Sequence, residues 1–268
     1  PIDTLRYEIT GDGVNFYTSA HDASNSTRYY RWDYTETYIF VSQLDSYFEF
    51  NNSASPYVSK KVVLRQPDEL IHTCYVTDTS NNVILGSSAN LAQDIVNNTP
   101  ITHVSSTSEK FYHRYSINLR QYALTRDAYQ FWSTLKKNTE ELGNIFDAQP
   151  SQLNSNIHCI TNPNEPVIGY LSVSTVSQKR VFIDNSQLPA WPLPAPTCMP
   201  YTISWSLGEG VPPYLSAFIA IPLGTISAGY DKDVKDSVYI VRVGDYDCVD
   251  CRYHFGGKTK KPDYWIDP

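Results

Sequence analysis

The chain has 268 residues, of which 41% are hydrophobic, and a formal net charge of −7 at pH 7. This length and content are enough for one large hydrophobic core or two small ones. The acidic balance, with KTKK at 258–261 as the densest basic run, argues against a nucleic-acid partner. The longest apolar stretch, 214–224, has the length of a buried strand and is too short for a membrane-spanning helix.

The composition indicates an all-β protein. Tyrosine is abundant at 21 residues and glycine is low at 12, and Thr, Ser, Val and Ile are frequent. Two alternating runs, 5–10 and 13–20, flank the turn signal GDG and predict a hairpin. Further strands are expected at 60–65, 70–77, 83–88 and 166–183, the last as a long strand or a hairpin.

The stretch YYRWDYTETYIF (29–40) alternates with a period of two, which predicts a strand. Its opposite face is mostly polar, and Glu36 interrupts the aromatic face. We therefore expect the aromatic face to lie in the core, with the side chains of Tyr30, Trp32, Tyr34, Tyr38 and Phe40.

The segment 109–124 predicts a further strand, with His113 on its apolar face as a core histidine. One amphipathic helix is expected to follow at about 126–142. Thr125 is a suitable N-cap, Asp127 favours the first turn, and Gly143 is placed to end the helix. The expected buried stripe consists of Ala128, Trp132, Leu135 and Leu142, with Phe131 beside it.

These elements predict a mainly β fold: an antiparallel β-sandwich-like domain with one amphipathic helix packed on it. We expect a single β-rich domain over 1–268. The proline-rich excursion 188–200 is extended, and we expect it to be pinned across the surface of that domain.

Cys248-Val-Asp-Cys251 is the sharpest local pattern. A redox pair lacks its usual βαβ setting, and a zinc site with His254 and Cys198 lacks a second close cysteine pair. Disulfide bonding is favoured, either within the pair or from one of its members to Cys198. A second bridge between Cys74 and Cys159 would leave one thiol over.

Two aspartate runs offer oxygen ligands, but neither has the glycine and distal glutamate of an EF-hand loop. We keep a weak calcium hypothesis for the second run, which contains Asp245, Asp247 and Asp250.

The sequence has no nucleophile elbow, no zinc-protease helix motif and no phosphate loop. We therefore expect no catalytic residues and no cofactor. A ligand platform would use aromatic residues of irregular segments. The candidates are Trp191, Trp205, Tyr214, Tyr264 and Trp265.

Several stretches together resemble a Bacteroidota family catalogued as a domain of unknown function, number 4249. They include RYYRWDYTETYIF, CYVTDTSNNVILGSS, PVIGYLSVSTVSQKRVFI and, most specifically, FDAQPSQL and CVDCR…GG…KPDYW. The resemblance covers nearly the whole chain in order.

The resemblance implies an exported lipoprotein, anchored at the outer membrane through an N-terminal lipidated cysteine. Its genes would lie beside those of TonB-dependent transporters, and a β-sandwich domain would precede this region. The sequence given begins at PIDTLRYE, so the anchor and the first domain are inferred. The family has no agreed catalytic residues to carry over.

The expected function is that of a non-enzymatic cell-surface lipoprotein that associates with a TonB-dependent transporter and assists substrate capture or uptake. Two alternatives are a surface enzyme acting on glycans or peptides, and an adhesin. The enzyme would need convergent carboxylates or a bound metal.

Overall fold

The structure is a computed structural model that describes residues 1–50, 62–140, 155–165, 167–192, 197–206, 221–222, 227–231 and 236–268. The fold is mainly β, with antiparallel strand pairs. The strands of the first half are β1 (Ile2–Ile9), β2 (Gly13–His21), β3 (Tyr29–Val41), β4 (Phe48–Phe50), β5 (Val62–Leu64), β6 (Thr73–Thr79), β7 (Ile84–Ser87), β8 (Ile95–Ser105) and β9 (Arg114–Leu124).

The helix α1 (Arg126–Glu140) follows β9 directly. The later elements are β10 (Val176–Asp184), β11 (Tyr201–Ser206), β12 (Ile221–Pro222), β13 (Ser227–Asp231), β14 (Asp236–Gly244) and the short helix α3 (Tyr246–Val249). Short 3-10 turns lie at Pro67–Glu69, Glu109–Phe111, Asn185–Gln187 and Cys251–Tyr253.

The chain divides into two compact units. Unit 1 comprises Pro1–Thr37, Asp78–Ser108 and Tyr115–Trp191, and unit 2 comprises Tyr38–Thr77, Glu109–Arg114 and Pro192–Pro268. The expectation of one domain over the whole chain stays a prediction.

The predicted hairpin of unit 1 is confirmed. β1 and β2 pair antiparallel with Ile9 opposite Val14, and the Thr10 N–H donates to the Gly13 carbonyl at 2.8 Å. β8 completes this sheet in the order β1-β2-β8, so it lies at an edge. β8 was not predicted, because Pro100 and a register shift break its alternation; an edge strand tolerates both.

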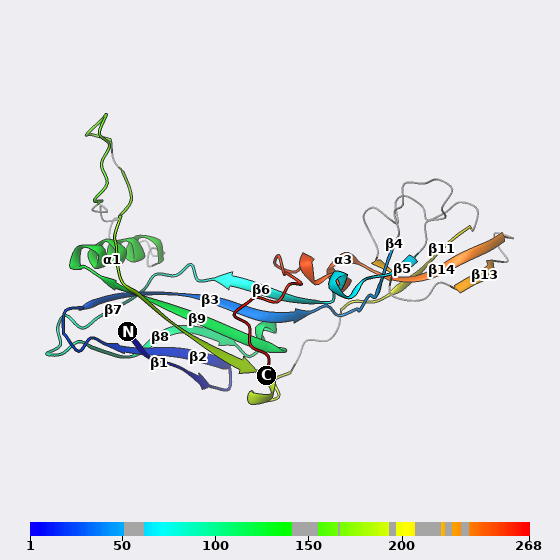
Figure 1. Cartoon of the computed structure of the whole chain (residues 1–268), viewed down its shortest axis with the longest axis horizontal. Coiled ribbons are helices and arrows are strands. Elements are labelled where there is room, and N and C mark those ends of the chain that lie inside the picture. Colours follow the sequence, from blue (N-terminus) through cyan, green and yellow to red (C-terminus); the bar gives the residue numbers. More distant parts are fainter. Residues whose placement is uncertain are drawn as a thin grey trace, which may run out of the picture. The chain divides into compact units, whose positions relative to one another are not determined.

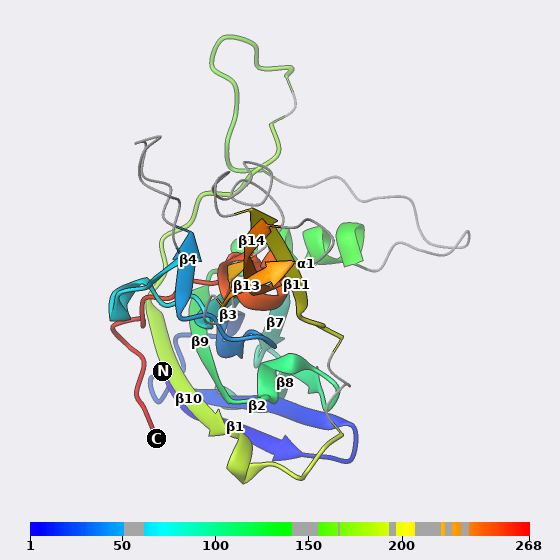
Figure 2. The same ribbon diagram turned by 90° about the vertical axis from the view of Figure 1, so that its right-hand side faces the viewer.

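The second sheet has the order β10-β9-β3-β6, and β7 also pairs with β3 (Figures 1 and 2). The aromatic face of β3 packs in the core as predicted: Tyr30, Trp32, Tyr34 and Tyr38 are buried, and Phe40, in unit 2, is half-buried. Within unit 1 the two sheets pack face to face. The rings of Phe16 and Tyr115 lie 5.7 Å apart, and the Tyr34 hydroxyl donates to Thr102 at 2.9 Å. The β-sandwich-like fold is therefore confirmed.

α1 packs against the opposite face of β3. The rings of Tyr29 and Tyr129 are 4.9 Å apart, and the Arg31 guanidinium lies 4.5 Å from the centre of the Trp132 ring. The N-cap is confirmed, because the Ala128 N–H donates to the Thr125 hydroxyl at 3.2 Å. Ala128 and Phe131 are the buried residues of the helix, whereas Trp132 and Leu135 are half-buried. Leu142 and Gly143 lie outside the described residues.

Two strand predictions need correction. His113 is exposed rather than a core histidine, because a 3-10 turn ends at Phe111 and β9 begins only at Arg114. The segment 167–175 is not a strand, and β10 begins at Val176. Most of the apolar stretch 214–224 lies outside the described residues.

Candidate functional site

The most strongly cross-linked part of unit 2 is the segment 245–253, which contains α3 and the 3-10 turn after it. Val249 packs against Ile71 in a buried cluster, with Leu44 and Tyr246 at its margin. The Cys251 N–H donates to the Ile71 carbonyl at 2.8 Å, and the Leu44 N–H donates to the Cys248 carbonyl at 3.0 Å. Such short helical turns depend on these tertiary contacts, because isolated they are too short to be stable.

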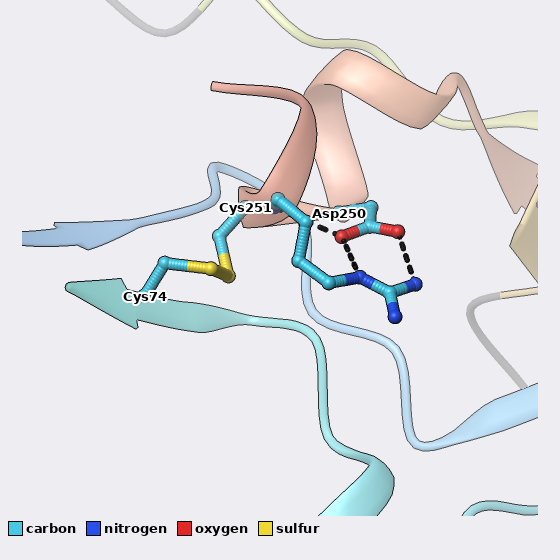
Figure 3. Close-up of a disulfide and its surroundings, with 4 residues drawn as sticks. Cys74, Asp250 and Cys251 are labelled. Atoms are coloured by element: carbon cyan, nitrogen blue, oxygen red, sulfur yellow. Dashed lines mark hydrogen bonds and ion pairs between the residues drawn. A yellow bond between two sulfur atoms is a disulfide. The ribbon is translucent and has the colours of Figure 1, made fainter. Parts of the chain in front are cut away.

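Two disulfides fix this segment to distant parts of unit 2. Cys251 is bonded to Cys74 on β6, and Cys248 is bonded to Cys198 just before β11. Figure 3 shows the first of these bonds. One of the predicted pairings, Cys198 to the Cys248/Cys251 pattern, is confirmed. The bridge between Cys74 and Cys159 is wrong: Cys74 pairs with Cys251, and Cys159 is a free thiol.

The disulfide at Cys198 also holds the end of the proline-rich excursion. The Gln43 side-chain carbonyl accepts hydrogen bonds from the backbone N–H groups of Thr197 and Cys198, both at 2.9 Å. This end of the excursion is pinned as expected, whereas residues 193–196 lie outside the described part.

Asp250 is buried between the two cysteines of the pattern and forms a bidentate ion pair with Arg252 (Figure 3). Its carboxylate also accepts the Arg252 N–H at 3.0 Å. Hydrogen bonding to Asp250 raises the pKa of the Arg252 guanidinium. The weak calcium hypothesis is not supported. The described residues contain no group of three or more His, Cys, Asp or Glu side chains that could hold a metal ion, and Asp245 accepts a hydrogen bond from the Tyr201 hydroxyl.

The C-terminal tail of unit 2 returns along β6. Tyr75 and Lys258 exchange two backbone hydrogen bonds, at 2.8 and 3.1 Å. Gly257 lies so close to the disulfide that an added Cβ would be 2.8 Å from both the Cys74 Cβ and the Cys251 carbonyl oxygen. The tail therefore ends as part of the packed body of unit 2.

The aromatic binding candidates do not gather at one place. Trp265 is buried and packs edge-on against Tyr75 with 5.2 Å between the rings, so it is a packing anchor. Tyr264 is exposed, and Trp191 is half-buried in unit 1. Tyr214 lies outside the described residues, and of Trp205 only the backbone, in β11, is described.

The surface beside the tail contains an open pocket of about 570 Å³, here called the unit 2 pocket. Four segments contribute to it: the loop after β3, the turn at Pro67–Glu69, the start of β6 and the tail. Its polar and aromatic lining residues are Asp45, Tyr47, Asp68, His72, Thr73, Tyr75, Thr259, Lys260 and Lys261. Sequence reasoning missed this pocket, because these residues carry no shared motif and meet only through the disulfide and the returning tail.

The unit 2 pocket combines charges of both signs with two tyrosines. A hydrogen bond to Asp45 raises the pKa of the Tyr47 phenol, and burial raises that of Tyr75. The His72 ring lies 4.0 Å from the Asp45 carboxylate. Lys260 is exposed and has no ion-pair partner among the described residues. Such an arrangement suits recognition of a polar or charged surface by exposed aromatic and ionic groups.

A second polar cluster of unit 2 surrounds His254. Its ring stacks on Phe40 at 3.7 Å, and its Nε2 lies 2.5 Å from the Glu109 carboxylate, which also accepts from the Tyr38 hydroxyl at 3.3 Å. No serine, threonine or cysteine is hydrogen-bonded to His254 in the part of the chain that the structure describes. The cluster joins the tail to Phe40 and Glu109 through ring stacking and a hydrogen bond.

No described helix combines the length and the apolar character that crossing a membrane requires. No curated protein and no solved structure matches the chain. The model of one family, described as a domain of unknown function (DUF4249), matches residues 1–180, which is more than half of the 268 residues. The matched region ends before Cys198 and the disulfide-bonded tail. By this match, the chain belongs to the DUF4249 family of domains of unknown function.

Proposed function

We propose that this chain is part of an exported, non-enzymatic cell-surface lipoprotein of the outer membrane. It associates with a TonB-dependent transporter and assists the capture or uptake of its substrate. The observation that carries this proposal is the unit 2 pocket, which lies beside a segment fixed by two disulfides.

The disulfides support the exported location. Disulfides persist in oxidising compartments, such as the cell surface and the bacterial periplasm, and are rare in the cytosol. Here four of the five cysteines are paired, and each pair joins segments far apart in the chain, with sequence separations of 177 and 50 residues. Such bonds stabilise the folded protein, because they restrict the conformations of the unfolded chain.

The unit 2 pocket supports a binding role. It is lined by the exposed side chain of Tyr47, which is 53% accessible, and by Lys260, whose ammonium group has no ion-pair partner among the described residues. Tyrosine is enriched among the few residues that carry most of the binding energy in protein interfaces. In our proposal the transporter docks through a loop that enters this pocket.

The experiment is a pull-down of the tagged protein, as produced in its own cell envelope, from gently solubilised outer membranes, followed by mass spectrometry. A stoichiometric TonB-dependent transporter is the expected result. Tyr47→Ala and Lys260→Glu should each reduce the recovered transporter. Met199→Ala, which changes an 82% accessible side chain of unit 2 outside the pocket, should not.

Recovery of the protein alone, under conditions in which other transporter complexes survive, would reject the accessory role and bring the enzyme or adhesin alternative forward. Recovery of the transporter with equal yield from all variants would keep the association but reject the docking site.

A further inference from the structure

The segment 167–175 directly precedes β10 and is here called the β10 extension. Its sequence, VIGYLSVST, has the apolar and β-branched content of a strand, yet it belongs to no strand pair of the described structure. β10 pairs with β9, and a hydrogen bond from the Ala123 N–H to the Thr175 carbonyl, at 3.2 Å, continues this pairing. Because β9 ends at Leu124 and α1 follows, the β10 extension runs past the end of its neighbour strand.

One edge of the β10 extension is held by side chains of the preceding segment. The Asn156 side-chain amide donates to the Leu171 carbonyl at 2.7 Å and accepts from the Leu171 N–H at 2.8 Å. The Ser155 hydroxyl donates to the Gly169 carbonyl at 2.7 Å. Like Thr175, these bonded residues have odd numbers. In an extended chain alternate residues direct their backbone groups to the same edge, so the even-numbered residues face the opposite edge.

The opposite edge is free. The backbone groups of Ile168, Tyr170, Ser172 and Ser174 have no hydrogen-bond partner in the part of the chain that the structure describes. The ring of Tyr170 packs 5.2 Å from that of Phe131 on α1, which fixes the extension to unit 1. An edge with unpaired backbone groups is a template for pairing with another strand.

The β10 extension also exposes apolar side chains. Residues 155–165 and 167–175 stand away from the sheets of unit 1 (Figures 1 and 2). Ile168, Leu171 and Val173 are 76%, 75% and 97% accessible, and Val176 at the start of β10 is 54% accessible. Exposed apolar side chains that gather in one segment mark interaction sites.

Charge favours a second copy of this chain as the partner. Identical copies with a net charge of −7 repel each other, so they can approach only where like charges do not meet. The stretch 167–178 meets this condition, because Tyr170 is its only ionisable side chain. Its sequence is also self-complementary about Ser172, since Leu171 then corresponds to Val173 and Ile168 to Val176. A centre at Leu171 would instead match Val173 with Gly169.

We propose that two copies of this chain pair through their β10 extensions, as antiparallel strands related by a two-fold axis at Ser172. The even-numbered residues form the hydrogen-bonded pairs, and Leu171 of one copy packs beside Val173 of the second. The contact is small, so the dimer is weak, with a Kd in the micromolar range or above. This proposal concerns unit 1 alone and does not rest on the association with a transporter.

The first test is oxidative cross-linking of the full chain. Cys159→Ser serves as the background, because Cys159 is the free thiol. In this background Ser172→Cys places two thiols at the two-fold axis, where the Cα atoms of a hydrogen-bonded pair lie about 5.5 Å apart, within the range of disulfides. Non-reducing electrophoresis should show a covalent dimer. Ser186→Cys, on an exposed turn of unit 1, is the matched control and should stay monomeric.

The second test is the register, measured by sedimentation equilibrium. Leu171→Lys and Val173→Glu should each weaken dimerisation by about 10-fold, through loss of apolar contact. Combined in one chain they should restore it, because the ammonium group introduced in each copy then faces the carboxylate introduced in the other. Both positions are exposed, so the unfolding temperature should stay that of the parent. Leu91→Lys, at an exposed position of unit 1 outside the extension, is the control and should dimerise as the parent does.

Three results would each overturn the proposal. The first is a yield of covalent dimer from Ser172→Cys no higher than that from Ser186→Cys. The second is a parent protein that sediments as a monomer at its highest soluble concentration. The third is a dimer that neither Leu171→Lys nor Val173→Glu weakens, which would place the contact elsewhere.

Discussion

In the core of unit 1 the Tyr115 phenol donates a hydrogen bond to the Glu36 carboxylate, with 2.6 Å between the two oxygens. Tyr115 on β9 is fully buried and Glu36 on β3 is 5% accessible. Glu36 is the one polar side chain on the aromatic face of β3, and this bond explains how it is tolerated there. A buried carboxylate needs hydrogen-bond donors, and a phenol from the neighbouring strand supplies one.

We predict that Tyr115→Phe lowers the free energy of unfolding by about 1 to 3 kcal/mol, the usual range for a hydrogen bond to a charged group. The substitution removes the donor and leaves the size of the ring nearly unchanged. Chemical denaturation at neutral pH measures the change. An unchanged free energy of unfolding would show that the Tyr115 bond does not support Glu36.

The same bond predicts a loss of stability at alkaline pH. Burial and the Glu36 carboxylate raise the pKa of Tyr115 well above the ordinary 10.0, and burial and Asp94 raise that of Tyr30. Above pH 10 the unfolded chain therefore releases protons that the folded protein retains. Each such tyrosine should lower the free energy of unfolding by about 1.4 kcal/mol per pH unit.

Tyr115→Phe should make this alkaline slope shallower by about 1.4 kcal/mol per pH unit. Ile117→Val is the matched control, because it weakens the same buried strand without removing a titrating group. Its curve should lie lower at every pH with the parent slope. Equal slopes for Tyr115→Phe and the parent would show that Tyr115 does not contribute to the loss of stability at alkaline pH.

The sequence predicted the parts of the fold that rest on local periodicity. Three predictions depend only on a few adjacent residues: the period of two in β3, the turn between β1 and β2, and the Thr125 cap. Each of them is confirmed. β8 was not predicted, because Pro100 interrupts the alternation of its residues. An edge strand tolerates such a proline, and the pairing with β2 shifts register at this point.

The candidate site was less predictable, because it depends on contacts between distant segments. The Cys248/Cys251 spacing was recognised, but each of these cysteines bonds to a different distant strand region. Trp265 was predicted as a candidate for a ligand platform, but its ring packs against that of Tyr75. No spacing rule relates positions 75 and 265.

We predict that the protein contains one free thiol, that of Cys159. Titration with a thiol reagent in denaturant should give one thiol before reduction and five after it. Three thiols before reduction would contradict one of the two disulfides.

Removal of the two disulfides should have unequal effects. Pairwise alanine substitution of Cys74 and Cys251 opens a loop of 177 residues, and that of Cys198 and Cys248 a loop of 50. Chain-entropy arguments predict losses of roughly 5 and 4 kcal/mol, a difference of about 1 kcal/mol. Denaturant unfolding of both double variants measures it. The reverse order would contradict this entropic account.

Gly257→Ala should destabilise unit 2 by about 1 to 3 kcal/mol, the usual range for overpacking. The added Cβ would meet the Cys74 Cβ and the Cys251 carbonyl, which the disulfide and backbone hold in place. Gly11→Ala is the control, because no atom lies within 4 Å of its added Cβ. Thermal unfolding should show a lower midpoint for Gly257→Ala alone, and equal midpoints would contradict the close packing.

The ion pair between Asp250 and Arg252 should stabilise the protein through its geometry as well as its charge. The Asp250 carboxylate is 2% accessible and the Arg252 side chain 54% accessible. Most of the loss of stability on breaking the pair should therefore come from leaving the buried Asp250 carboxylate without its donors. Arg252→Ala should lower the free energy of unfolding by about 1 to 3 kcal/mol, because it removes two side-chain donors from a buried carboxylate. Arg252→Lys keeps the charge but loses the bidentate contact and should recover only part of this loss. Asp250→Asn is the second single variant of this test. The double variant Asp250→Asn, Arg252→Ala should lose less stability than the sum of the losses of Asp250→Asn and Arg252→Ala, because it leaves no unpaired charge at this site. Urea unfolding of the parent, these two single variants and the double variant tests this coupling, and strictly additive losses would show that the two side chains act independently.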